Sequence, residues 1–190
     1  MGHNVISIEP FYENILRIHK ASSLENTKDK ITLINNALSN KRNEIKMLQP
    51  NLKNVGGQGL LEHKNKSFSR DDMASNKYLV ETILLDDILG FIPKNSQNSI
   101  YKKAMIKVDI EGFEAFAFQG AKRLFATFEI QIILMEWVWL VPQVESHHII
   151  KEMIDLFYDH GLKPYDGDKL LEKQNWLKWS YEVIWKRDGL

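Results

Sequence analysis

Two carboxylates occupy a turn in the second half of the chain. Asp109 and Glu111 follow the apolar run 104–108, and the next residue, Gly112, permits a backbone conformation that other residues resist. A carboxylate pair at such a turn can hold a sugar or the cationic end of a cofactor, or remove the proton of an acceptor hydroxyl. It can equally well do no more than cap a helix that begins near Phe113. The residues alone leave both interpretations open.

Polar residues also close the other expected strands. The candidates are Glu9, Asn36, Asp109 and Glu136. Ligands of an open parallel sheet bind outside the carboxyl ends of its strands, so these positions matter more than those inside the strands. An acidic residue that closes the second strand of a nucleotide-binding half can bind both ribose hydroxyls, which makes Glu9 a ribose-binding candidate. A carboxylate at the positive end of a helix that starts at Pro10 explains Glu9 as well.

The elements that must position these residues alternate along the chain. Apolar runs typical of strands lie at 5–8, 31–34, 78–85, 104–109, 130–135, 162–165 and 181–185. Apolar residues at helical spacing lie within 11–18, 113–125 and 149–157, the last ending near Gly161. This order predicts an α/β fold in which helices cover a mostly parallel sheet. We expect a single domain over 1–190, with a loop-rich insertion at 39–77.

Composition excludes several classes of function. The 190 residues are 44% hydrophobic and 26% charged, which is typical of a globular chain. The net charge is zero and no basic stripe occurs, so we expect no nucleic-acid partner. The absence of cysteine excludes thiol catalysis and cysteine-ligated zinc, and the histidines show no metal-ligand spacing, so no metal site is expected. No apolar run reaches the roughly 18 residues of a membrane span.

Two further motifs carry little chemistry. The run 56–59 (Gly-Gly-Gln-Gly) lacks the G-x-G-x-x-G spacing that cradles a dinucleotide, which weighs against a nucleotide-binding oxidoreductase. Trp137 and Trp139 follow Glu136, and their rings could stack on a sugar, although packing in the core is the commoner role.

Four sequence blocks together resemble a known family. They are 5–10 (VISIEP), 31–39 (ITLINNALS), 82–87 (TILLDD) and 106–114 (IKVDIEGFE). These blocks are similar to those of FkbM-like methyltransferases, class I enzymes that use S-adenosylmethionine and are typified by O-methylation of sugar or related hydroxyls. The resemblance implies a Rossmann-like sheet with helices on both faces and an antiparallel last strand. It also implies a small-molecule or carbohydrate acceptor.

The resemblance assigns roles to individual residues. The implied cofactor-binding residues are Glu9 with Pro10 at the ribose, Asn36 and Ala37 at the adenine, and Asp109 near the methionine end. The implied candidates for the catalytic base are Asp109, Glu111 and Glu136.

One departure from the family pattern changes the expectation. The class begins with a strand that ends in a turn of the approximate form D-x-G-A-N-x-G, and nothing before Glu9 matches it. We therefore expect the first strand, the glycine-rich turn and most of the first helix to be missing, which removes the centre of the sheet. An active methyltransferase and a non-catalytic remnant that serves as an interaction module are both compatible with this pattern.

Overall fold

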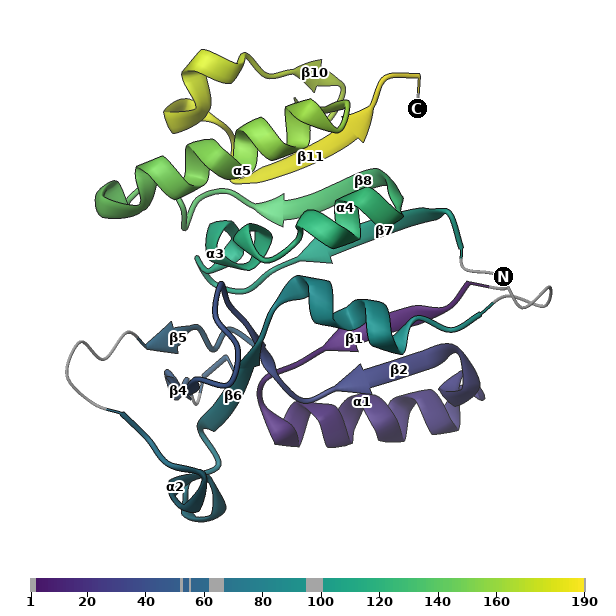
Figure 1. The fold of residues 1–190 in the computed structure, drawn as a ribbon, viewed down its shortest axis with the longest axis vertical. Helices are drawn as coiled ribbons and strands as arrows, with labels where there is room; N and C mark the ends of the chain where they lie inside the picture. Colours follow the sequence, from purple (N-terminus) through teal and green to yellow (C-terminus); the bar gives the residue numbers. More distant parts are fainter. Residues whose placement is uncertain (1–2, 52, 55, 62–66, 95–100, 190) are drawn as a thin grey trace. The chain divides into compact units, whose positions relative to one another are not determined.

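The computed structural model describes residues 3–51, 53–54, 56–61, 67–94 and 101–189. The chain divides into two compact units, Met1–Pro93 and Lys94–Leu190 (Figure 1). The first unit contains β1 (Val5–Ile8), α1 (Tyr12–Leu24), the 3₁₀-helix η1 (Lys28–Lys30), β2 (Ile31–Ile34), β3 (Ala37–Leu38), β4 (Ile45–Leu48), β5 (Leu60–Leu61), α2 (Arg70–Ser75), β6 (Leu79–Ile83) and the 3₁₀-helix η2 (Leu85–Phe91). The organisation as one domain stays a prediction.

A parallel strand pair begins the first unit. The strands β1 and β2 pair from Val5 with Ile31 to Ile8 with Ile34, which confirms both expected runs. Helix α1 connects them and packs on β2. The helix begins after Pro10, because the Glu9 side chain accepts the N–H of Phe11 and this residue forms an extended N-cap. Glu9 therefore lies in the short connection between β1 and α1.

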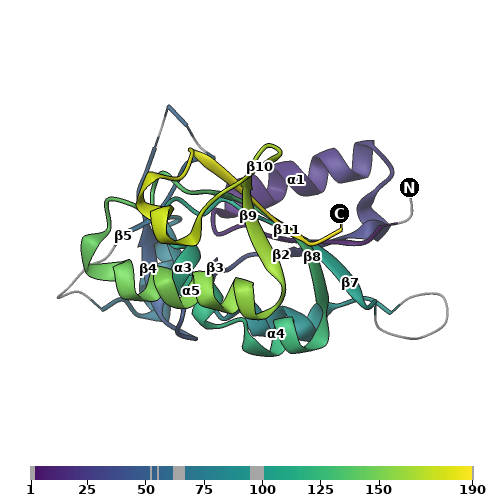
Figure 2. The same ribbon diagram turned by 90° about the horizontal axis from the view of Figure 1, so that it is seen from above.

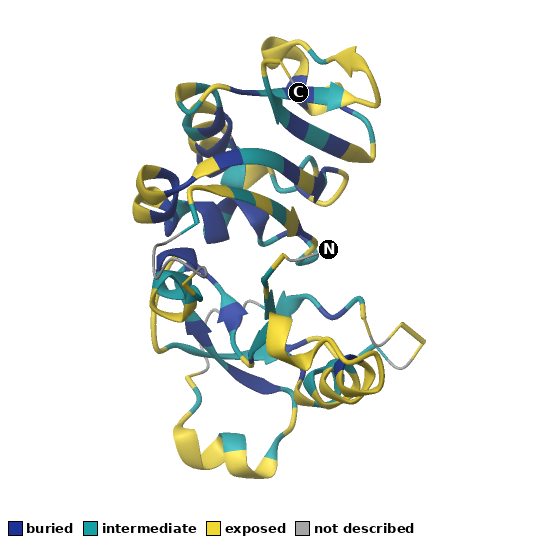
Figure 3. Cartoon of the chain, turned by 90° about the vertical axis from the view of Figure 1, so that its right-hand side faces the viewer, coloured by how far each residue is buried: buried dark blue, intermediate teal, exposed yellow. Residues whose placement is uncertain are grey.

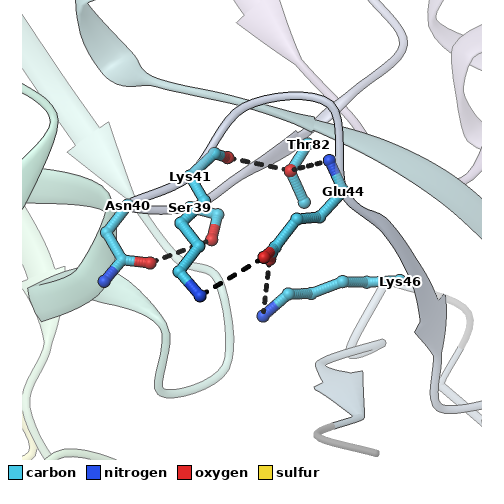
Figure 4. A network of polar contacts seen from close by, with 6 residues as sticks. All are labelled: Ser39, Asn40, Lys41, Glu44, Lys46 and Thr82. Atoms are coloured by element: carbon cyan, nitrogen blue, oxygen red, sulfur yellow. Dashed lines mark hydrogen bonds and ion pairs between the residues drawn. The ribbon is translucent and has the colours of Figure 1, made fainter. Parts of the chain in front are cut away.

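The second sheet of the first unit has the order β3-β6-β4-β5 and is mixed. It includes two strands from the segment 39–77, which also contains α2. The buried side chain of Thr82 on β6 holds the preceding loop: its Oγ1 donates to the Lys41 carbonyl at 2.8 Å and accepts the Glu44 N–H at 3.1 Å (Figure 4). The segment is thus more regular than a loop, and its status as an insertion stays a prediction.

The second unit is built on one larger sheet. Its elements are β7 (Lys103–Val108), α3 (Glu114–Gln119), α4 (Lys122–Thr127), β8 (Glu129–Glu136), the 3₁₀-helix η3 (Val144–Ser146), α5 (His147–Asp159), β9 (Leu162–Asp166), β10 (Lys169–Leu170), the 3₁₀-helix η4 (Lys173–Lys178) and β11 (Glu182–Arg187). The strand order is β10-β9-β11-β8-β7. Strands β7 and β8 are parallel, and β11 lies antiparallel to both of its neighbours.

Helices α3, α4 and α5 lie on the same side of this sheet (Figure 2). The expectation of a single helix over 113–125 is wrong, because the chain turns at Gly120 and continues as α4 after Ala121. Glycine is costly inside a helix, which explains the break at this position. The predicted end of α5 is confirmed: Gly161 has φ of +76° and donates its N–H to the Tyr158 carbonyl.

The α/β class is confirmed, whereas a single mostly parallel sheet is not found among the described strands. They form three sheets of two, four and five strands, and the two larger sheets are mixed. Among the described strands, β1 pairs with β2 alone and β7 with β8 alone. The first strand that we expect from the sequence to be missing stays a prediction. No helix of the described residues has the length and apolar character to cross a membrane.

Candidate functional site

The turn after β7 has an unusual backbone. Glu111 has φ of +55° and Gly112 has φ of +98°, so two consecutive residues adopt the left-handed region. A non-glycine residue in this region costs on the order of 1 kcal/mol or more and persists only where the surroundings impose it. The turn therefore holds Glu111 in a backbone conformation that a relaxed chain would avoid.

Neither candidate carboxylate of the turn caps the helix that follows. The N-cap of α3 is Phe113, and the side chain of this residue makes no capping hydrogen bond. Glu114 supports the turn instead: it is fully buried, and its Oε1 accepts the Ile110 N–H at 3.1 Å. Burial raises the pKa of Glu114 to about 7, against backbone hydrogen bonds that lower it. Among the described residues, its Oε2 has no hydrogen-bond partner.

The three candidate catalytic carboxylates meet at the ends of β7 and β8. Burial raises the pKa of Glu111, and the charges of Asp109 and Glu136 raise it further. Asp109 is itself paired with Lys107, whose Nζ lies 2.9 Å from Oδ2. Lys107, Asp109, Glu136 and Glu182 line a depression of about 140 Å³, which is smaller than the roughly 300–1,000 Å³ of typical ligand pockets.

Two aromatic residues bind the Glu136 carboxylate. Its Oε2 accepts the Trp139 Nε1–H at 2.8 Å and the Tyr181 hydroxyl at 3.2 Å. Both residues are about half exposed, at 46% for Trp139 and 54% for Tyr181. Burial raises the pKa of the Tyr181 hydroxyl first and the charge of Glu136 raises it next, so the hydroxyl stays a donor. Trp137 is buried instead and donates to the Trp176 carbonyl, which assigns it to the core.

Sequence reasoning missed Tyr181 and Gln143. Tyr181 reaches Glu136 because β11 runs antiparallel to β8 and pairs Glu182 with Glu136. Gln143 lies in the loop after β8, and its Nε2 donates to the carbonyls of Gly112 and Trp139, each at 2.8 Å. Only the antiparallel pairing of β11 could have pointed to Tyr181, and no sequence signal points to Gln143.

The candidate cofactor residues of the first unit lie at the ends of β1 and β2. Glu9 is half-buried, and burial raises its pKa, whereas the Phe11 N–H and the Asn14 side chain lower it. The neighbouring Asn35 side chain donates to the carbonyls of Glu9 and Pro10, both at 2.9 Å, and so links the two strand ends. These contacts suit a carboxylate at a helix start, and the role of Glu9 at a ribose stays a prediction.

Asn36 and Ala37 have structural contacts of their own. Asn36 Nδ2 donates to the Glu81 carbonyl at 2.9 Å. Ala37 is buried in a cluster with Phe11, Leu48 and Val80. The structure thus groups the candidate residues into two sets, one in each unit. No group of His, Asp and Glu with the arrangement of a metal site occurs in the part of the chain that the structure describes.

Comparison with known proteins identifies the family. The model of the methyltransferase FkbM domain matches residues 1–163. The chain belongs to the FkbM methyltransferase family, which confirms the resemblance seen in the sequence blocks. Membership points to methyl transfer and implies a methyl donor.

A solved structure shares the fold. The crystal structure of methyltransferase FkbM from Methylobacillus flagellatus KT is similar, with a TM-score of 0.50 and 14% sequence identity. The match covers 97% of this chain but 36% of that chain, so the present chain spans about a third of the length of this relative. Identity this low shows the fold alone. No curated protein matches the chain.

Proposed function

We propose that the chain transfers a methyl group from S-adenosylmethionine to a hydroxyl oxygen of a sugar or related acceptor. The observation that carries this proposal is the group of Asp109, Glu111 and Glu136 at the ends of β7 and β8, in a chain of the FkbM family. Acceptor hydroxyls must lose a proton when they are methylated, and a carboxylate with a raised pKa, as Glu111 has, is suited to accept it.

Residues of the first unit supply groups for the donor. Glu9 would bind the ribose hydroxyls, and Asn36 and Ala37 would lie beside the adenine. When bound, S-adenosylmethionine supplies a methyl group that its sulfonium already makes electrophilic. A half-buried carboxylate at a strand end, Glu9, suits the ribose hydroxyls of this donor.

Glu111 is the best proton acceptor of the three carboxylates. Asp109 is paired with Lys107, and Glu136 accepts two hydrogen bonds from aromatic side chains. The pKa of Glu111 is raised by burial and by both neighbouring carboxylates, which strengthens it as a base. We therefore assign to Glu111 the proton that the acceptor oxygen would lose. The methyl group would pass to that oxygen as its bond to the donor's sulfonium sulfur breaks, and the donor would leave as a neutral thioether. Asp109 would lie near the methionine end of the donor, and Glu136 would orient the acceptor.

One observation favours the non-catalytic alternative. The depression at the carboxylates is small for a ligand. A chain that does not bind the donor could still offer this surface to a protein partner. Titration calorimetry with S-adenosylmethionine separates the two: micromolar binding, about 8 kcal/mol, requires a working donor site, and Glu9→Gln should weaken that binding.

The activity test uses radiolabelled S-adenosylmethionine with a panel of sugar acceptors. Glu111→Gln should reduce turnover at least about a hundredfold and leave the melting temperature unchanged. Glu25→Gln, at an exposed carboxylate beyond the end of α1, is the matched control and should keep full turnover. An unchanged rate in Glu111→Gln with a lower melting temperature would assign the residue to stability instead.

A further inference from the structure

We infer that Gln143 is a positioning residue, which ties the turn at Glu111 to the loop after β8 and so holds Glu111 against Glu136. Its significance for methyl transfer rests on the proposed function, whereas the geometric link does not. Gln143 belongs to neither the candidate cofactor residues nor the candidate catalytic residues.

The Gln143 amide joins two loops. A primary amide has two N–H donors, and Nε2 directs one to the Gly112 carbonyl and one to the Trp139 carbonyl, each over 2.8 Å. Gly112 lies in the turn after β7, 31 residues away along the chain, and Trp139 follows β8. The amide therefore binds both loops at once. Loss of the side chain would leave the carbonyls of Gly112 and Trp139 without this hydrogen bond.

The space at Gly112 is fitted to this amide. A Cβ atom added to Gly112 would lie 2.6 Å from Gln143 Nε2 and 3.5 Å from Trp139 Cβ. The φ of +98° at Gly112 independently disfavours any side chain. Glycine is thus required by the backbone conformation, and a Cβ atom would also displace the Gln143 amide from its position.

The link continues from Trp139 to the second carboxylate. The indole N–H of Trp139 donates to Glu136 Oε2 at 2.8 Å, so a continuous path of contacts joins Glu111 and Gly112, through Gln143 and Trp139, to Glu136. From the inner side, the buried Glu114 binds the Ile110 N–H. The turn is therefore fixed on two sides, and Gln143 supplies the fixation from the loop.

This arrangement has an electrostatic consequence that can be measured without turnover. Burial is the largest cause that raises the pKa of Glu111, followed by the charges of Asp109 and Glu136. The charge of Glu111 in turn raises the pKa of the Tyr181 hydroxyl. If the link opens, Glu111 gains solvent and moves away from Glu136. Both changes lower the pKa of Glu111 toward the ordinary value of a glutamate.

The test is a carbon-13 NMR titration of the glutamate carboxyl groups in the full chain. In Gln143→Ala, the Glu111 titration should shift to lower pH, and the amide resonances of Gly112 and Trp139 should move. Gln143→Met keeps the length and bulk of the side chain without its donors, and it should show the same shift. The matched control is Gln131→Ala on β8, which removes an amide bound to the Glu129 carbonyl and should leave Glu111 unchanged.

An unchanged Glu111 titration in both Gln143 variants would overturn the inference. This result is distinct from a failure of the proposed function, because the titration needs neither donor nor acceptor. If the native chain transfers methyl groups, both variants should also lose about 10- to 100-fold in kcat at an unchanged KM for the donor. A full kcat in an active protein would count against the positioning role.

Discussion

The two units of the molecule bury different kinds of side chain. Among the described residues, every buried polar or charged side chain except Glu114 belongs to the first unit, whereas most of the buried apolar ones belong to the second. Helix α1 buries only Ser22 and α2 buries none of its residues, whereas α5 buries a continuous apolar face (Figure 3). The first unit therefore depends more on satisfied hydrogen bonds, and the second on packing.

The aromatic core of the second unit illustrates the difference. The ring of Phe157 lies 4.7 Å from that of Phe118, 5.8 Å from Phe125 and 4.8 Å from Trp185. In the first unit, Phe11 stacks on Tyr78 at 5.5 Å within a small cluster. A dense core gives a rigid support, and the carboxylate turn stands at the end of strands that belong to this denser unit. Strain at Glu111 is compatible with such a support.

The largest expected effect tests the packing side of this contrast. Phe157→Ala removes a ring that is fully buried among other rings, and it should lower the free energy of unfolding by about 3 to 5 kcal/mol. Urea denaturation followed by tryptophan fluorescence measures the change. Leu16→Ala, on the exposed side of α1, should stay within about 0.5 kcal/mol. A loss below about 1 kcal/mol for Phe157→Ala would remove the distinction between the units.

The second prediction concerns Glu114, the exception among the buried polar residues. Its pKa rises from 4.5 to about 7 on folding, so the folded state binds more protons than the unfolded state between these values. The contribution of Glu114 to stability should therefore be fully present below about pH 4.5 and should be lost as the pH rises through about 7. The loss amounts to about 3 kcal/mol for a shift of this size.

Glu114→Gln isolates this contribution from those of other carboxylates. The amide keeps an oxygen for the Ile110 N–H but does not ionise, so the difference in unfolding free energy between the native chain and the variant should change from pH 5 to pH 8. We expect the variant to gain relative to the native chain at the higher pH. A constant difference across this range would show that ionisation of Glu114 does not destabilise the folded state.

The smallest predicted effect tests the hydrogen-bonded side of the contrast. Thr82→Val keeps the shape of a fully buried side chain but removes the hydroxyl that serves Lys41 and Glu44 (Figure 4). Two backbone groups then lose their partner, and stability should fall by about 1 to 3 kcal/mol in chemical denaturation. Thr82→Ser retains the hydroxyl and should cost less than the valine. The reverse order would indicate that the methyl group, and not the network, matters at this position.

Local patterns in the sequence predicted much of the fold. The strands β1, β2, β7 and β8 were identifiable as apolar runs, because a buried strand must be apolar over its short length. Helix α5 was identifiable from its apolar face and from Gly161 at its end. The break at Gly120 was missed, since apolar spacing continues across it and hides the change of direction.

The sequence by itself determined the family and the three carboxylates that the second unit brings together. Residue types and short spacings sufficed, because Asp109 and Glu111 are neighbours and strand ends are visible in the pattern. Only the tertiary structure decided that Glu114 lies inside the turn, that Tyr181 binds Glu136, and that Gln143 joins the two loops. These contacts depend on the antiparallel pairing of β11 with β8 and on the left-handed backbone of the turn at Glu111 and Gly112. The pairing of β11 is long-range, and no local pattern of residues encodes it. At the turn, Gly112 marked an unusual backbone in the sequence, whereas nothing local marked the left-handed φ of Glu111.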